Sequence, residues 1–173
     1  MTDLNSTAAA LLGLLHGKDA SGYELWNAAR EFIGDFWTVT RSQVYRELTA
    51  LDGHGLIEAQ AVGPRSRRAY RITREGRTAF ADWLAQPPGP EQIRYPLLLT
   101  LAFGAELGTD TLLGFIDSHR PMHEQRLAAY RELATSGGLD RYQRATLGFG
   151  LHYEQAVLAW MDGLPALLTE AVQ

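Results

Sequence analysis

The sequence predicts a mainly α-helical protein with one small β-hairpin, organised as two domains. Three observations support this prediction: apolar residues recur at helical spacing, two short strand-like stretches flank a turn at 63–66, and a proline-rich break occurs at 87–90. The break cannot continue a helix, because proline lacks a backbone N–H. We therefore predict an N-terminal domain over 1–86, a linker over 87–90 and an all-α C-terminal domain over 91–173.

The composition excludes several classes of site. Among its 173 residues the chain has no cysteine, so a disulfide framework, a thiolate nucleophile and a Cys-ligated zinc site are excluded, and we expect a cytoplasmic protein. The longest uncharged stretches, 4–17 and 95–105, are shorter than the roughly 20 apolar residues that span a bilayer. No basic segment precedes the first stretch, as it would in a signal peptide. We expect no membrane partner.

Positive charge is concentrated in one segment, although the formal net charge of the chain is -4. Residues 41–77 contain eight arginines against four acidic residues. Because a phosphate backbone attracts such a local surplus of basic charge, this segment is the candidate nucleic-acid contact.

Three helices are expected before the hairpin. Apolar residues predict the first over 6–16, with Ser6 as its N-cap. The second and third helices begin where a hydroxyl residue stands three positions before Glu or Gln, which is the spacing of a capping box. These pairs are Ser21 with Glu24, and Thr40 with Gln43.

The third helix has two faces of different chemistry. Its buried face is predicted to carry Val44, Leu48 and Leu51, which follow the i, i+4, i+7 spacing. A helical wheel places a set of polar side chains away from these apolar ones. The predicted exposed set is Arg41, Ser42, Tyr45, Arg46 and Thr49.

A hairpin and a fourth helix follow the third helix. Gly55 is expected to end that helix, since glycine is the usual residue past a helix C-terminus. Strands are predicted over 56–62 and 67–73, and Thr73 is expected to cap a helix that extends to Leu84. The order helix, helix, helix, strand, strand, helix is that of a winged helix-turn-helix.

The exposed face of the third helix suits the major groove of double-stranded DNA. Arginine can donate bidentately to guanine, serine and threonine can contact base or phosphate, and tyrosine can bond a phosphate or pack on a thymine methyl group. Arginines of the hairpin can reach the DNA backbone or the adjacent minor groove, whereas Arg71 and Arg74 are expected on the body of the domain. The hairpin candidates are Arg65, Arg67 and Arg68.

The C-terminal domain is expected to need a second copy of the chain. Helices are predicted over 93–105, 109–134 and 139–172, with Pro121 and Pro165 kinking or interrupting the two longer ones. Three helices in about eighty residues offer each other few packing partners, so a homodimer is the expected source of the missing surface.

The first 85 residues resemble the PadR family of bacterial transcriptional regulators. The resemblance lies in LLGLL (11–15), SGYEL (21–25), FWTVTRSQVYRELTAL (36–51), GLIEA (55–59), GPRSRRAYRIT (63–73), EGR (75–77) and WL (83–84). The family commonly has proline in the turn before SGYEL, where this chain has Lys18-Asp19-Ala20. The ending HYEQAVLAWMDGLPALL (152–168) is similar to the larger subfamily with a helical C-terminal dimerisation domain.

The resemblance implies a homodimer that binds a pseudo-palindromic operator, usually to repress, through the third helix and the wing. Family members respond to phenolic acids or other hydrophobic compounds, so a small hydrophobic or aromatic effector is also implied. The candidate effector residues are Trp37, Tyr95 and Trp160, although aromatic residues at helical spacing more often belong to a core.

Other kinds of site have little support. His119 and His123 have a spacing that can hold a metal, but Pro121 lies between them and no third ligand is evident, so we expect solvated histidines. We therefore predict no metal and no cofactor. No set of acid, base and nucleophile indicates an enzyme. The alternative function is a winged-helix protein-interaction module without specific DNA binding, in which the arginines only solvate the surface.

Overall fold

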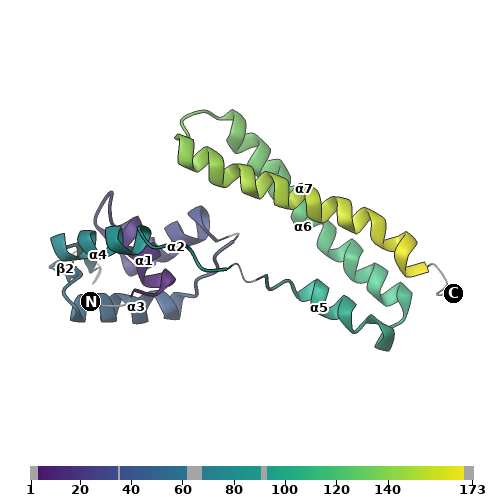
Figure 1. The fold of residues 1–173 in the computed structure, drawn as a ribbon, viewed down its shortest axis with the longest axis horizontal. Coiled ribbons are helices and arrows are strands. Elements are labelled where there is room, and N and C mark those ends of the chain that lie inside the picture. Colours follow the sequence, from purple (N-terminus) through teal and green to yellow (C-terminus); the bar gives the residue numbers. More distant parts are fainter. Residues whose placement is uncertain (1–3, 35, 62–67, 91–92, 170–173) are drawn as a thin grey trace. The chain divides into compact units, whose positions relative to one another are not determined.

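The computed structural model describes residues 4–34, 36–61, 68–90 and 93–169. The chain divides into two units, residues 1–90 and 91–173 (Figure 1). Residues 87–90 form neither helix nor strand. Across the described ranges, none of the helices has both the length and the apolar composition needed to cross a membrane.

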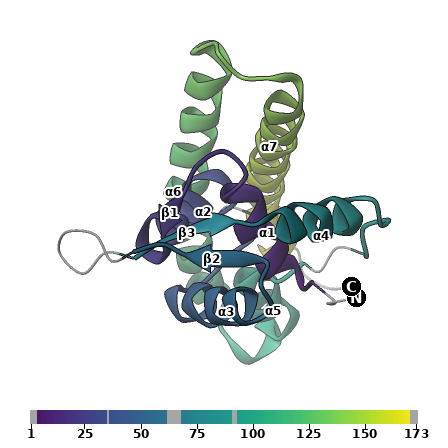
Figure 2. The same cartoon turned by 90° about the vertical axis from the view of Figure 1, so that its left-hand side faces the viewer.

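The first unit combines helices with a small antiparallel sheet. Figure 2 shows the sheet, in which the strands lie in the order β1-β3-β2. The predicted mainly α fold with a β-hairpin is therefore confirmed. The elements are α1 (Ser6–Leu14), β1 (Ala20–Ser21), α2 (Gly22–Phe32), α3 (Arg41–Gly53), β2 (Ile57–Ala59), β3 (Ala69–Ile72) and α4 (Arg74–Leu84).

The sheet differs from the prediction in two ways. Strands β2 and β3 are shorter than the predicted 56–62 and 67–73, and the predicted turn lies outside the described residues. Strand β1 was not predicted, because two residues are too few to show the alternation that indicates a strand. It pairs with β3 through Ala20 opposite Tyr70 and thereby joins the start of α2 to the sheet.

Both predicted capping boxes are confirmed. The Ser21 hydroxyl accepts from the Glu24 backbone N–H, and the Glu24 carboxylate accepts from the Ser21 N–H at 2.8 Å. At the start of α3, the Thr40 hydroxyl accepts from the Gln43 N–H at 3.2 Å, and the Gln43 side chain accepts from the Thr40 N–H at 2.8 Å. These reciprocal bonds satisfy N–H groups that the helix itself leaves unpaired.

The predicted cap of α1 was wrong by one residue. Asn5 is the N-cap, and its side-chain oxygen accepts from the Ala8 N–H at 2.9 Å. Ser6 is instead the first residue of the helix. Asparagine caps as well as serine does, so residue type alone could not choose between neighbouring positions.

The core of the first unit forms where α3 packs against α1 and the sheet. The predicted residues Val44, Leu48 and Leu51 are buried, as are Leu12 and Ile57 opposite them. Gly55 has a φ of +70°, the left-handed conformation that lets the chain leave α3 and enter β2. The face of α3 that points away from this core is consequently fixed.

The second unit is all-helical in its described residues. Its elements are α5 (Pro96–Ala102), a 3₁₀ turn η2 (Gly104–Glu106), α6 (Thr109–Thr135) and α7 (Arg141–Thr169). The long helices α6 and α7 pack against each other (Figure 1), and each continues through its proline, Pro121 or Pro165, without interruption. The core residues of this unit are Leu97, Ile116, Met161 and Leu164.

Replacing Gly76 with alanine should strongly destabilise the first unit. A Cβ at Gly76 would lie 2.0 Å from the Leu56 carbonyl oxygen, a backbone atom that cannot rotate away. We expect Gly76→Ala to lower the free energy of unfolding by about 1–3 kcal/mol, as overpacking does, measured by urea unfolding. The control is Gly53→Ala, where a Cβ meets nothing within 4 Å. Equal unfolding midpoints for the two variants would contradict this contact.

Candidate nucleic-acid interface

Five polar or aromatic side chains gather on the exposed side of α3. Each of them is exposed, whereas the apolar side of the same helix is buried. The exposed residues are those that the helical wheel predicted, namely Arg41, Ser42, Tyr45, Arg46 and Thr49. The structure therefore assembles one continuous face of hydrogen-bond donors and an aromatic ring.

Tyr45 serves both the packing of the domain and this face. A Cβ added to Gly22 would lie 2.8 Å from the Tyr45 ring, so the ring rests on the first residue of α2. Tyr45 nevertheless remains 40% exposed. A glycine at the start of α2 is therefore required for the ring to pack this closely, while its remaining surface stays open to a ligand.

Tyr23 belongs to this face, and the sequence analysis missed it. The Arg41 guanidinium carbon lies 5.8 Å from the centroid of the Tyr23 ring and 5.6 Å from that of Tyr45. Such cation–π contacts hold a guanidinium in place without using its N–H donors. A signal was present in the sequence, because Tyr23 lies inside the capping box between Ser21 and Glu24, next to the start of a helix.

The base of the wing meets the same face. Arg68 is exposed and lines one groove together with Tyr23, Tyr45 and Tyr70. The start of α2, the middle of α3 and the start of β3 therefore border a single depression. The other wing candidates, Arg65 and Arg67, lie outside the described residues.

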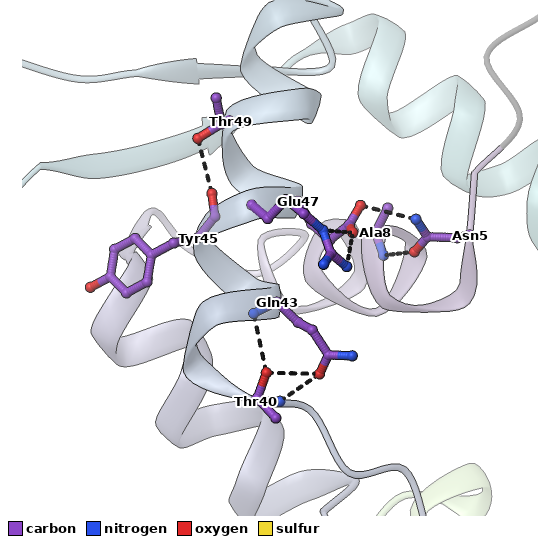
Figure 3. Close-up of polar contacts among 8 residues, drawn as sticks. Asn5, Ala8, Thr40, Gln43, Tyr45, Glu47 and Thr49 are labelled. Atoms are coloured by element: carbon purple, nitrogen blue, oxygen red, sulfur yellow. Dashed lines mark hydrogen bonds and ion pairs between the residues drawn. The ribbon is translucent and has the colours of Figure 1, made fainter.

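Thr49 and Arg46 on α3 are held by hydrogen bonds within the domain, and Figure 3 shows the bond of Thr49. The Thr49 hydroxyl donates to the Tyr45 carbonyl at 3.0 Å, so its oxygen can still accept a bond from a ligand. Arg46 donates to the Glu47 carboxylate at 3.0 Å, and its side chain is 70% exposed. Both residues thus keep hydrogen-bonding capacity on the exposed side.

Arg71 stays on the body of the domain, as expected. Its Nε and Nη2 donate to the Asp19 carboxylate at 3.0 and 2.7 Å. This hydrogen bond lowers the pKa of Asp19 and raises the pKa of Arg71. The charge of Arg71 is therefore largely matched by Asp19, whereas Arg41 and Arg68 have no carboxylate bonded to them within the described residues.

The three candidate effector residues do not belong to one unit. Trp37 lies in the first unit and is exposed, whereas Tyr95 and Trp160 lie in the second with ring centroids 6.0 Å apart. The Tyr95 hydroxyl is 2.9 Å from Nε2 of His123. Burial raises the pKa of Tyr95, and the nearby Tyr153 and Glu154 add to the rise.

The expectation that both histidines of α6 are solvated was wrong for His123. Its side chain is 2% exposed, and its Nδ1 bonds the carboxylate of Glu154, which is 1% exposed. Arg126 donates to the other oxygen of Glu154 at 3.0 Å. His119 remains partly exposed, and among the described residues no three His, Cys, Asp or Glu come together as metal ligands. The sequence could not distinguish the two histidines, because the burial of His123 depends on its contact with Glu154 of α7.

Family models match both halves of the chain. Residues 11–82 match the transcriptional regulator PadR-like family, and residues 93–169 match the family described as virulence activator alpha C-term. The first range contains α2, α3, the sheet and most of α4, and the second contains α5, α6 and α7.

Individual relatives match over nearly their whole length. The probable transcriptional regulator Rv1176c of Mycobacterium tuberculosis is 26% identical over 93% of this chain and 96% of its own. The negative transcriptional regulator PadR of Bacillus subtilis is 24% identical over 92% of this chain and 95% of its own.

Solved structures share the fold. The virulence activator AphA of Vibrio cholerae has a TM-score of 0.72 at 27% identity, covering 94% of this chain and 98% of that one. Bacillus subtilis PadR has been crystallised with operator DNA, with a TM-score of 0.77 at 23% identity over 95% and 99% of the two chains. It has also been crystallised with p-coumaric acid, with a TM-score of 0.69 at 22% identity over 98% and 100% of the chains.

Glu154→Gln should destabilise the second unit. The substitution removes the charge that Arg126 and the buried His123 share, and breaking a buried pair on one side costs about 3–5 kcal/mol. Glu124→Gln is the matched control on α6, because its pairing with Arg120 at 3.8 Å is on the surface and contributes about 0–1 kcal/mol. Guanidinium unfolding followed by tryptophan fluorescence measures both. If Glu154→Gln unfolds at the same denaturant concentration as the control, the network does not stabilise this unit.

Proposed function

Because the chain belongs to the PadR-like family of transcriptional regulators, we propose that it is a repressor that binds a pseudo-palindromic operator as a homodimer. In this proposal residues 1–86 read DNA, 87–90 link the two domains, and 91–173 dimerise and receive an effector. The single observation that supports DNA reading best is the exposed face of α3, whose opposite face is buried in the core.

The chemistry of this face supports contact with the major groove. Arg46 would donate to base edges, and Ser42 and Thr49 would bond bases or phosphates. Arg41, supported by two tyrosine rings, would contact the backbone at the start of α3. Since phosphate contacts position a protein and base contacts specify a sequence, the two arginines would have different roles.

The wing would supply the second contact. Arg68 lies beside Tyr45 at the edge of the face, and Arg65 and Arg67 belong to the same chain segment in the sequence. We propose that these arginines reach the DNA backbone or the adjacent minor groove. Bacillus subtilis PadR, which shares this fold, has been crystallised with operator DNA.

Exposed apolar side chains on the second unit support the proposed homodimer. Its buried core is small, while several large apolar side chains remain exposed, and a second copy would cover them. A dimer would also fix the spacing of the two half-sites, about one helical turn of DNA or a multiple of it. The exposed side chains include Leu98, Leu99, Phe103, Phe115, Leu133 and Phe149.

We further propose a small hydrophobic or aromatic effector. Trp160 and Tyr95 form an aromatic pair next to the His123 ring, which is the kind of lining that planar compounds contact. Bacillus subtilis PadR has been crystallised with p-coumaric acid, a compound of this class.

Arg46→Ala should weaken specific DNA binding. We expect a loss of about 1–3 kcal/mol and relaxed specificity at one base position, measured by fluorescence anisotropy on promoter duplexes across a salt series. The control is Arg71→Ala, because Arg71 already bonds Asp19 and should change affinity much less. Wild-type binding that depends on neither sequence nor salt would reject the proposal. Unchanged affinity in both Arg46→Ala and Arg68→Ala would favour a protein-interaction module.

A chain truncated after Gln86 should be a monomer that binds DNA poorly. The truncation removes the helices proposed to dimerise and keeps the core around α3 intact. Sedimentation velocity should show a dimer for the full chain and a monomer for the truncated one. A stable dimer of residues 1–86 would move the dimer interface to the first unit.

A further inference from the structure

One acidic side chain lies beside the candidate DNA face and is buried. Glu47 has a side chain that is 10% exposed, although it follows Arg46, whose side chain is 70% exposed. Successive residues of a helix point about 100° apart, so Glu47 faces α1 while Arg46 faces outward. A carboxylate near a DNA backbone repels phosphate, and a buried one also loses hydration, so its presence needs a compensating reason.

The two carboxylate oxygens of Glu47 have different partners. Oε2 accepts from the side-chain amide of Asn5 at 2.9 Å, and Oε1 accepts from Nε and Nη2 of Arg46 at 3.3 and 3.0 Å. Figure 3 shows the Asn5 side chain directed at Glu47 and also at the Ala8 backbone. Asn5 therefore caps α1 with its oxygen and holds Glu47 with its nitrogen, which fixes the carboxylate from the side opposite Arg46.

This arrangement leaves one defined edge of Arg46 available. A guanidinium has five N–H donors, and Glu47 takes the one on Nε and one on Nη2. The remaining donors, on Nη1 and Nη2, form the fork that matches O6 and N7 of guanine or two phosphate oxygens. Without Glu47, an exposed arginine would have to lose rotamer freedom when it bound such a target.

We propose that Glu47 is a positioning residue that orients Arg46 for base reading, with Asn5 as its anchor. The inference rests on the proposed function, because it assumes that α3 reads DNA through Arg46. The carboxylate then lowers general attraction to phosphate and in return raises discrimination between sequences. The first effect weakens binding to any DNA, whereas the second favours the preferred sequence over others. Affinities measured on two sequences can therefore separate them.

The test compares Glu47→Gln with the wild-type full-length chain on two duplexes. One is selected from a random pool by the wild-type chain, and the other has the same composition in scrambled order. Glutamine has a single acceptor oxygen, so it cannot hold both Asn5 and Arg46 as the carboxylate does. We expect the affinity ratio between the duplexes to fall by about tenfold, within the range of a bidentate arginine contact. Affinity for the scrambled duplex should stay the same or rise.

A double-variant cycle separates positioning from a general effect on the fold. In an Arg46→Ala background, Glu47→Gln should leave the affinity ratio unchanged, because the side chain it positions is gone. A further fall of the ratio in that background would overturn the proposal. So would an unchanged ratio when Glu47→Gln is made alone.

Two further variants separate the role of the Asn5 anchor from a general effect of removing negative charge. Asn5→Ser keeps an N-cap acceptor for α1 but removes the amide that holds Glu47, so it should lower the ratio by less than Glu47→Gln does. If Glu47→Gln does not fold, Asn5→Ser alone tests the proposal. An affinity ratio unchanged by Asn5→Ser would then overturn it. Glu75→Gln removes the same charge from the first turn of α4 and should not change the ratio.

The failure of this inference differs from the failure of the proposed function. If the random pool yields no preferred sequence for the wild-type chain, then the proposed function fails and the inference with it. If the wild-type chain selects a sequence and Arg46→Ala lowers the ratio while Glu47→Gln does not, only the role of Glu47 is rejected.

Discussion

The burial of Val44, Leu48 and Leu51 fixes the rotation of α3, and the arrangement of the whole first unit depends on it. Burial of each such side chain stabilises the folded domain by roughly 1.5–3 kcal/mol, so a rotation of the helix about its axis would lose several of these contributions at once. Because side chains on a helix are rigidly spaced, fixing one face also fixes the other. Packing of the apolar face thus directs Arg41, Tyr45 and Arg46 outward, and their own contacts then hold each side chain in place.

Polar contacts set the position of α3 along its own axis. The capping box of Thr40 and Gln43 determines where α3 begins, and Gly55 determines where the chain leaves it. Glu47 then joins the middle of α3 to Asn5, the N-cap of α1. A hydrogen bond to a buried carboxylate is directional and costly to break. It is therefore suited to fixing how α3 is aligned with α1, because apolar contacts are not directional.

The second unit uses a buried polar network for a similar purpose. Glu154 on α7 bonds His123 and Arg126 on α6, and His123 continues to Tyr95, just before α5. Three segments that are distant in the sequence are therefore tied at one place, where the side chains of His123 and Glu154 are buried. The cost of burying the carboxylate is offset only when both of its oxygens are bonded, so the network favours one alignment of the two long helices.

Much of the first unit could be predicted from the sequence, because its signals are local. Capping boxes, the buried stripe of α3, the glycine after it and the exposed polar set all follow from the spacing of neighbouring residues, and the structure reproduces them. Contacts between distant residues could not be predicted. The pairing of β1 with β3, the packing of Tyr45 on Gly22, the burial of His123 and the bond from Asn5 to Glu47 join residues far apart in the chain. The sequence by itself determined which residues could face a ligand, whereas the tertiary structure decided how each is held, because periodicity encodes the faces of a helix but not the partner that each face meets.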